Sequence, residues 1–195
     1  AVVTTRTRAH DDLSLIAYVQ AMENTDHAGD SSGQNNESEL VAYWRTLYNT
    51  VLYDSPAESA TFNTSGWIET ANGSPITEAD MQEQVEQTIS RAKANSPQRI
   101  LETGCGTALL SFRLAPGCKR YVGIDISTAA LKHVRETIDT LPDLAHVELV
   151  EATADELASV APGEFDLVLL NSVIQYFPTF EYLTHVVRAA AARLA

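Results

Sequence analysis

Cationic side chains are scarce in this sequence, and their scarcity argues against one class of partner. The 195 residues include 13 Lys and Arg against 26 Asp and Glu, which gives a formal net charge of −13 at pH 7. Proteins that bind nucleic acids need a basic face to neutralise phosphates. No nucleic-acid partner is therefore expected, and the excess of acid is explained as charge that keeps the chain in solution.

Cysteines and long apolar runs are also scarce. Only Cys105 and Cys118 occur, with no CxxC pair and no His/Cys cluster at zinc spacing. Neither a disulfide framework nor a metal site is predicted. No apolar run approaches the ~20 residues of a membrane span, and the first residues lack the pattern of a secretion signal. A cytoplasmic protein without a membrane partner is expected.

The first part of the chain has its own composition. Two β-rich runs, 1–7 and 13–20, flank a polar turn at 10–12, so residues 1–20 are predicted to form a β-hairpin. Residues 21–38 are rich in Gly, Ser, Asn and Asp, which predicts a flexible linker. Residues 39–96 are predicted to hold two helices. They are placed at 39–53 and 77–94, the second with Thr77 as its N-cap.

From residue 97 onward the pattern alternates between strand and helix. Such alternation predicts an α/β fold, in which a Rossmann-like parallel sheet over residues 97–195 is covered by helices on both faces. The strands are expected at 99–103, 120–125, 147–151 and 165–171, and the helices at 107–114, 128–140 and 180–194.

A glycine turn followed by an acid is the strongest functional signal. The first of these strands runs into Gly104-Cys105-Gly106, where a backbone without Cβ atoms can approach a ligand closely. The next strand ends at Asp125, about 20 residues on, where a carboxylate can accept hydrogen bonds from both hydroxyls of a ribose. This pattern fits both a dinucleotide and S-adenosylmethionine (SAM).

Two details favour SAM over a nicotinamide or flavin cofactor. Leu109 stands where a dinucleotide fold needs its third glycine. Glu102 precedes the first glycine by two residues, where an acid can orient the ammonium group of the cofactor and favour a sulfonium.

Two segments that follow later strands add candidate contacts. Asp155 is placed to accept a hydrogen bond from an adenine amino group, with Ala154 leaving room for the ring, although Asp155 is equally well placed to cap a short helix. Residues 171–178 follow the fourth strand, at the carboxyl edge of the sheet where ligands bind in open α/β folds.

The motifs together resemble a known family. The segments GCGTALL (104–110), VGIDIS (122–127) and NSVIQYFP (171–178) are similar to the methyltransferase domains embedded in nonribosomal peptide synthetases. WRTLYNTVLYD (44–54) and residues 62–81 resemble the leading cap of that family. Residues 1–20 resemble the hairpin of the small C-terminal subdomain of an adenylation domain, which implies an interrupted adenylation domain.

The resemblance implies a class I SAM-dependent methyltransferase fold. Seven strands are typical of that fold, and only four are predicted here, so the sheet is expected to be incomplete at its C-terminal end. The implied reaction is N-methylation of the α-amine of an aminoacyl thioester held on a phosphopantetheinyl carrier protein. Methylation of a side-chain S, O or C atom and a non-catalytic embedded module remain alternatives.

The resemblance also implies site residues and partners. The cofactor-binding candidates are Glu102, Gly104, Cys105, Gly106, Asp125, Ile126, Ala154, Asp155 and Asn171; the catalytic candidates are Asn171, Gln175 and Tyr176. The implied partners are the aminoacyl carrier protein, the adenylation domain in cis and a small MbtH-like accessory protein.

Overall fold

The computed structural model describes residues 2–7, 13–18, 33–54, 59–69 and 73–195. The chain divides into two compact units, residues 1–34 and 35–195. In the first unit, β1 (Val2–Thr7) and β2 (Leu13–Tyr18) pair antiparallel, with Val2 opposite Tyr18. The predicted hairpin is thus confirmed in its strands, while its turn at 10–12 and residues 21–32 of the predicted linker lie outside the described residues.

Helix α1 (Gly33–Asp54) begins six residues before the predicted start at 39. Residues 33–38, predicted to belong to the linker, are therefore helical. Their polar composition misled the prediction, because a helix nucleated by its neighbours extends through polar residues at little cost. Helix α2 (Glu78–Lys93) begins as predicted: the backbone N–H of Asp80 donates to the Thr77 hydroxyl at 3.2 Å.

Four parallel strands form the sheet of the second unit, in the order β5-β4-β3-β6. The strands β3 (Arg99–Thr103), β4 (Arg120–Asp125) and β5 (Val147–Glu151) have the predicted bounds. Strand β6 (Leu167–Leu169) is shorter than the predicted 165–171, because its ladder with β3 spans only these residues. Phe165 instead forms an isolated parallel bridge with Leu194.

Short helices connect and cover the strands. They are α3 (Ser111–Leu114), α4 (Thr128–Ile138), α5 (Leu157–Val160) and α6 (Phe180–Ala191). The predicted helix over 107–114 is reduced to its last turn, because Ala108 has a φ of 64°. That left-handed conformation is incompatible with a right-handed helix.

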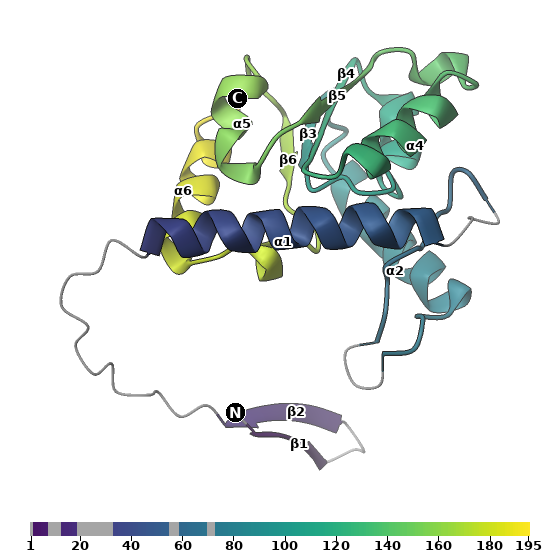
Figure 1. Ribbon diagram of the computed structural model, residues 1–195. Helices are drawn as coiled ribbons and strands as arrows, with labels where there is room; N and C mark the ends of the chain where they lie inside the picture. Colours follow the sequence, from purple (N-terminus) through teal and green to yellow (C-terminus); the bar gives the residue numbers. More distant parts are fainter. Residues whose placement is uncertain (1, 8–12, 19–32, 55–58, 70–72) are drawn as a thin grey trace. The chain divides into compact units, whose positions relative to one another are not determined.

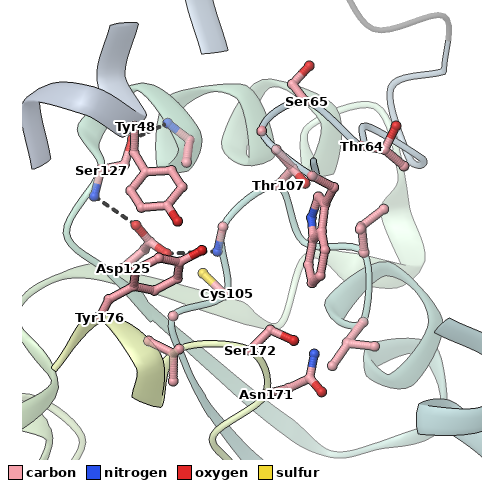
Figure 2. Close-up of a pocket in the computed structure, with 18 of the residues that line it drawn as sticks. Tyr48, Thr64, Ser65, Cys105, Thr107, Asp125, Ser127, Asn171, Ser172 and Tyr176 are labelled. Carbon is pink, nitrogen blue, oxygen red and sulfur yellow. Dashed lines mark hydrogen bonds between the residues drawn. The ribbon is translucent and has the colours of Figure 1, made fainter. Parts of the chain in front are cut away.

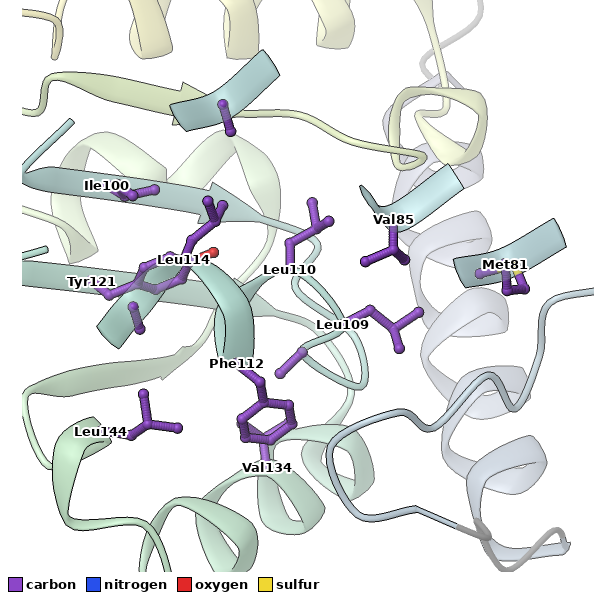
Figure 3. Packing of buried hydrophobic residues seen from close by; sticks show 13 residues of the cluster. Met81, Val85, Ile100, Leu109, Leu110, Phe112, Leu114, Tyr121, Val134 and Leu144 are labelled. Carbon is purple, nitrogen blue, oxygen red and sulfur yellow. The ribbon is translucent and has the colours of Figure 1, made fainter. Parts of the chain in front are cut away.

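Helices pack on both faces of the sheet, α4 on one side and α5 with α6 on the other (Figure 1). The first face is filled by side chains of α2, α3 and α4 against β3 and β4, among them Met81, Val85, Leu114, Tyr121 and Val134 (Figure 3). On the second face, Leu157 of α5 and Val186 of α6 pack against Leu101 of β3 and Val122 of β4, together with Phe165. With both faces covered, the carboxyl edge of the strands is where loops and ligands meet. None of the described helices is long and apolar enough to cross a membrane.

One exposed carboxylate ties the start of β3 to the start of β6. Asp166 accepts hydrogen bonds from the backbone N–H groups of Gln98 (2.8 Å) and Arg99 (2.9 Å), and from the Arg99 guanidinium at 2.7 Å. The Arg99 guanidinium and these backbone donors lower the pKa of Asp166 to about 2. Asp166 therefore stabilises the folded chain at pH values above 3.8, the pKa of this carboxyl in the unfolded chain. This contribution is lost as the pH falls through about 2, its pKa in the folded chain.

Replacing Asp166 by Asn should remove that pH dependence. The wild type is expected to be more stable than Asp166→Asn above pH ~4, and the difference should shrink as the pH falls from ~4 through ~2. Thermal melts at several pH values measure it. Glu164→Gln is the control, because the Glu164 carboxylate lies 3.9 Å from Arg99 and is 70% exposed. Equal losses in both variants would contradict the role of Asp166.

Candidate functional site

The glycine turn after β3 closes tightly against two other elements. Gly104 and Gly106 both have positive φ angles, 74° and 50°. The backbone N–H groups of Gly104 and Cys105 donate to the carbonyl of Ile124 at 2.7 and 3.1 Å. A Cβ on Gly104 would lie 2.6 Å from Val173, whereas a Cβ on Gly106 would meet no atom within 4 Å. Gly104 thus permits packing, and Gly106 borders open space.

Asp125 connects the ends of β3 and β4. One of its carboxylate oxygens accepts from the backbone N–H of Gly106, and the other from that of Ser127, both at 2.8 Å (Figure 2). Burial raises the pKa of Asp125, although these hydrogen bonds oppose the shift. Each oxygen keeps a second lone pair, so the carboxylate can still accept hydrogen bonds from a ligand.

Glu102 is a buried carboxylate in the wall of the same cavity. It is 3% exposed, and one of its oxygens accepts from the hydroxyls of Ser111 (2.7 Å) and Tyr121 (2.5 Å). Burial raises the pKa of Glu102 to about 7, against the lowering effect of both hydroxyls. A cation bound nearby would favour the ionised form and bring the pKa down again.

These groups border a single cavity with a volume of about 1580 Å³. Pockets for drug-sized ligands measure roughly 300–1,000 Å³, so the cavity has room for a cofactor and part of a second molecule. One wall is the carboxyl edge of the sheet. The other walls come from α1, α2 and the segments 59–69 and 73–76, the first of which contributes Trp67.

Nearly all of the predicted site residues meet in this cavity. Those in its lining are Glu102, Gly104, Cys105, Gly106, Asp125, Ile126, Ala154, Asn171, Gln175 and Tyr176. Figure 2 shows Tyr176 close to Asp125, with Asn171 and Ser172 on the other side of Cys105. Gln175 is exposed, and its side-chain amide donates to the carbonyl of Ser172 at 2.9 Å.

Asp155 is the exception, because it is not among the lining residues. Its carboxylate accepts from the Tyr182 hydroxyl at 2.7 Å. The alternative prediction, that Asp155 caps the short helix, is wrong: Thr153 and Glu156 form the capping box there. Tyr182 itself lines the cavity, so Asp155 borders the cavity through Tyr182, and its contact with an adenine amino group stays a prediction. Its partner lies 27 residues away in the sequence, which is why local spacing did not reveal it.

Trp44 and Tyr48 are cavity residues that the sequence analysis did not select. They lie one turn apart on α1, and both pack against Tyr176. The ring centroid of Tyr176 lies 4.7 Å from that of Trp44 and 5.5 Å from that of Tyr48. Aromatic residues spaced four apart on a helix share one face. That spacing could have marked them as a pair, although nothing local shows what the face contacts.

Unpaired polar atoms test whether the cavity fits an adenosyl cofactor. Within the described residues, the buried side-chain polar atoms without a partner are Trp44 Nε1 and Thr103 Oγ1, and both residues line the cavity. Buried polar atoms are usually paired, so a polar ligand is the natural partner. With the Asp125 carboxylate, the acid Glu102 and the space at Gly106, the residues fit a ligand that carries ribose hydroxyls and an ammonium group.

Comparison with known proteins agrees with this geometry. Residues 101–195 match the family described as a methyltransferase domain. They form a methyltransferase domain.

Solved structures share the fold of this methyltransferase domain, that of class I SAM-dependent methyltransferases. The magnesium protoporphyrin IX methyltransferase of Synechocystis PCC 6803, with bound S-adenosylhomocysteine (SAH), aligns with a TM-score of 0.59 at 19% identity, over 80% of this chain and 68% of that one. The N-methyltransferase NodS of Bradyrhizobium japonicum WM9 aligns with a TM-score of 0.55 at 19% identity, over 60% and 64% of the two chains.

The whole chain is also similar to segments of much longer proteins. It is 35% identical to the chondramide synthase cmdD of Chondromyces crocatus over 185 residues, 94% of this chain and 5% of that protein. It is 33% identical to the beauvericin nonribosomal cyclodepsipeptide synthetase of Beauveria bassiana over 195 residues, 97% of this chain and 6% of that protein. The chain thus spans about a twentieth of the length of these relatives.

The conformation of Gly104 predicts a stability effect. Gly104→Ala should lower the free energy of unfolding by about 2 kcal/mol or more, because a Cβ there is strained by the positive φ and overlaps Val173. Gly117→Ala is the matched control, since a Cβ at Gly117 meets nothing within 4 Å. Urea denaturation measures both. Equal effects of the two substitutions would contradict the packing of the turn.

The raised pKa of Glu102 predicts a pH effect with a defined sign. A carboxyl whose pKa rises from 4.5 to about 7 on folding stabilises the protein below pH 4.5, and this stabilisation is lost as the pH rises through about 7. Relative to Glu102→Gln, the wild type should therefore lose up to about 3 kcal/mol over this range. Urea denaturation between pH 4.5 and 8 tests this. If the free energy of unfolding changed with pH in the same way for the wild type and Glu102→Gln, the prediction would be refuted. Glu136→Gln, at an exposed position of α4, controls for general charge effects.

Proposed function

We propose that this chain is the SAM-dependent methyltransferase part of a nonribosomal peptide synthetase. It methylates the α-amine of an aminoacyl group held as a thioester on a carrier protein. The observation that carries the proposal is the shared cavity, which is lined by the glycine turn, Asp125 and Asn171. Similarity to synthetases over 94% and 97% of the chain supports the assembly-line context.

The residues of the glycine turn and the two acids hold the cofactor. Asp125 uses its remaining lone pairs to accept from the ribose hydroxyls, and Gly106 leaves the space that the ligand fills. Glu102 orients the ammonium group, and its ionised form is stabilised by that positive charge. When bound, SAM supplies an electrophilic methyl group on a sulfonium centre.

The acceptor amine needs alignment more than activation by a strong base. Methyl transfer is an in-line displacement, so the protein has to hold the nucleophile in a row with the methyl group and the sulfur. The side-chain oxygen of Asn171 accepts from the amine and aims its lone pair. Among the described residues no histidine lines the cavity, so water is proposed to take up the proton that the amine loses. Gln175, exposed at the rim, contacts the incoming acceptor, whereas Tyr176 beside Asp125 is better placed for the cofactor.

The partners follow from the synthetase context. The carrier protein brings the aminoacyl thioester to the mouth of the cavity, and the adenylation domain in cis supplies the activated amino acid. An MbtH-like accessory protein stays a prediction from the sequence resemblance. The hairpin of residues 1–20 is proposed to belong to the small subdomain of the adenylation domain.

Carrier-bound substrates test the proposal directly. An aminoacyl group loaded on a phosphopantetheinyl carrier should gain one methyl group in the presence of SAM. Fragmentation mass spectrometry should place the methyl on the α-nitrogen. Asn171→Ala should lower kcat by about 10²-fold through misalignment, while calorimetric SAH binding persists. Asp125→Ala should lose SAH binding.

Each contrary result separates one alternative. A methyl group on a side-chain atom would refute N-methylation and keep the methyltransferase. Unchanged turnover of Asn171→Ala would refute the role of Asn171. A folded chain that binds SAH but methylates no carrier-bound aminoacyl group would indicate a non-catalytic module.

A further inference from the structure

Helix α1 is attached to the segment that directly follows Asp125. The side-chain oxygen of Asn49 accepts from the Ser127 hydroxyl at 2.8 Å and from the backbone N–H of Ala129 at 3.2 Å. The Arg45 guanidinium donates to the carbonyl of Ile126 at 3.3 Å. Because Ser127 also donates its backbone N–H to Asp125, the position of α1 is coupled to the carboxylate that is proposed to hold the ribose.

An aromatic wall joins α1 to the turn after β6. Trp44 and Tyr48 both pack edge-on against Tyr176, with interplanar angles of 62° and 83°. All three side chains line the cavity, and Figure 2 shows Tyr48 and Tyr176 close to Asp125. Burial, the hydrogen bond with Tyr176 and the nearby charge of Asp125 raise the pKa of Tyr48. Its hydroxyl is therefore neutral and can donate a hydrogen bond.

The buried indole nitrogen of Trp44 indicates that the cavity holds a ligand with an acceptor atom. Trp44 Nε1 is buried and has no partner among the described residues. An indole N–H can only donate, and a buried donor without an acceptor costs free energy that folding must offset. A ligand in the cavity that offers an acceptor atom would supply the missing partner.

We propose that Trp44, Tyr48 and Tyr176 form the nucleoside subsite of the cavity. Trp44 Nε1–H and the Tyr48 hydroxyl donate hydrogen bonds to the adenosyl group, and the tyrosine rings cover the ribose at Asp125. The inference rests on the proposed function, since it takes SAM as the cofactor. It makes α1, which lies before the sheet in the sequence, part of the cofactor site. Flat apolar rings suit a nucleoside, which offers both an aromatic face and polar edges.

Matched substitutions on α1 test the inference by binding. Trp44→Phe removes the N–H and keeps a ring, and Tyr48→Phe removes a hydroxyl beside Asp125. Each should weaken calorimetric SAH binding by about tenfold, the effect of one lost hydrogen bond. Tyr43→Phe is the control, because Tyr43 is on the same helix, is 58% exposed and is not among the lining residues. It should bind SAH within about twofold of the wild type, as surface changes rarely matter.

Fluorescence locates the contact within the ligand. The chain has two tryptophans, so Trp67→Phe leaves Trp44 as the sole indole. Its emission should change on titration with 5′-methylthioadenosine, which carries the adenosyl group without the amino acid part, and should not change with methionine.

The outcomes distinguish this inference from the proposed function. A wild type that binds SAH, with Trp44→Phe and Tyr48→Phe binding equally well, would overturn the subsite and leave the methyltransferase proposal standing. Emission that responds to methionine and not to the nucleoside would also overturn the subsite. A wild-type chain that is folded in thermal melts but does not bind SAH would overturn both.

Discussion

The carboxylate of Asp125 is the constraint on which the site depends. It accepts a backbone N–H from Gly106 on one side and from Ser127 on the other, both at 2.8 Å. One side chain thus sets the distance between the turn after β3 and the turn after β4. The carbonyl of Ile124 strengthens the same junction by accepting from Gly104 and Cys105. All four of these donors are backbone N–H groups.

A second carboxylate in the same cavity has the opposite character. Asp125 is half-buried and bonded to the backbone, whereas Glu102 is almost fully buried and bonded to the hydroxyls of Ser111 and Tyr121. Burial dominates at Glu102 and raises its pKa to about 7, with a further contribution from the charge of Asp125. A buried acid that is costly to ionise without a nearby positive charge suits a cationic ligand, because the ligand provides that charge. The same buried acid lowers the stability of the folded chain at neutral pH and favours the binding of a cation.

The elements that precede the sheet in the sequence complete the cavity. Helix α1 contributes Trp44 and Tyr48 and is attached to Ile126, Ser127 and Ala129 by Arg45 and Asn49. The segment 59–69 is attached at another point, where the Thr107 hydroxyl donates to the carbonyl of Asn63 at 2.5 Å. A parallel sheet alone offers ligands only an open edge, and these additions supply the other walls of the cavity.

The sequence by itself determined the frame of the site. The bounds of β3, β4 and β5, the N-cap at Thr77, the glycine turn and Asp125 all follow from local patterns of apolar, glycine and capping residues, which act over a few positions. Only the tertiary structure decided what those patterns meet. It assigned Asp155 to Tyr182, brought Trp44 and Tyr48 onto Tyr176, put Ala108 in a left-handed conformation and buried Glu102. Each of these depends on contacts between residues distant in the sequence or on the removal of water, and neither is encoded in local spacing.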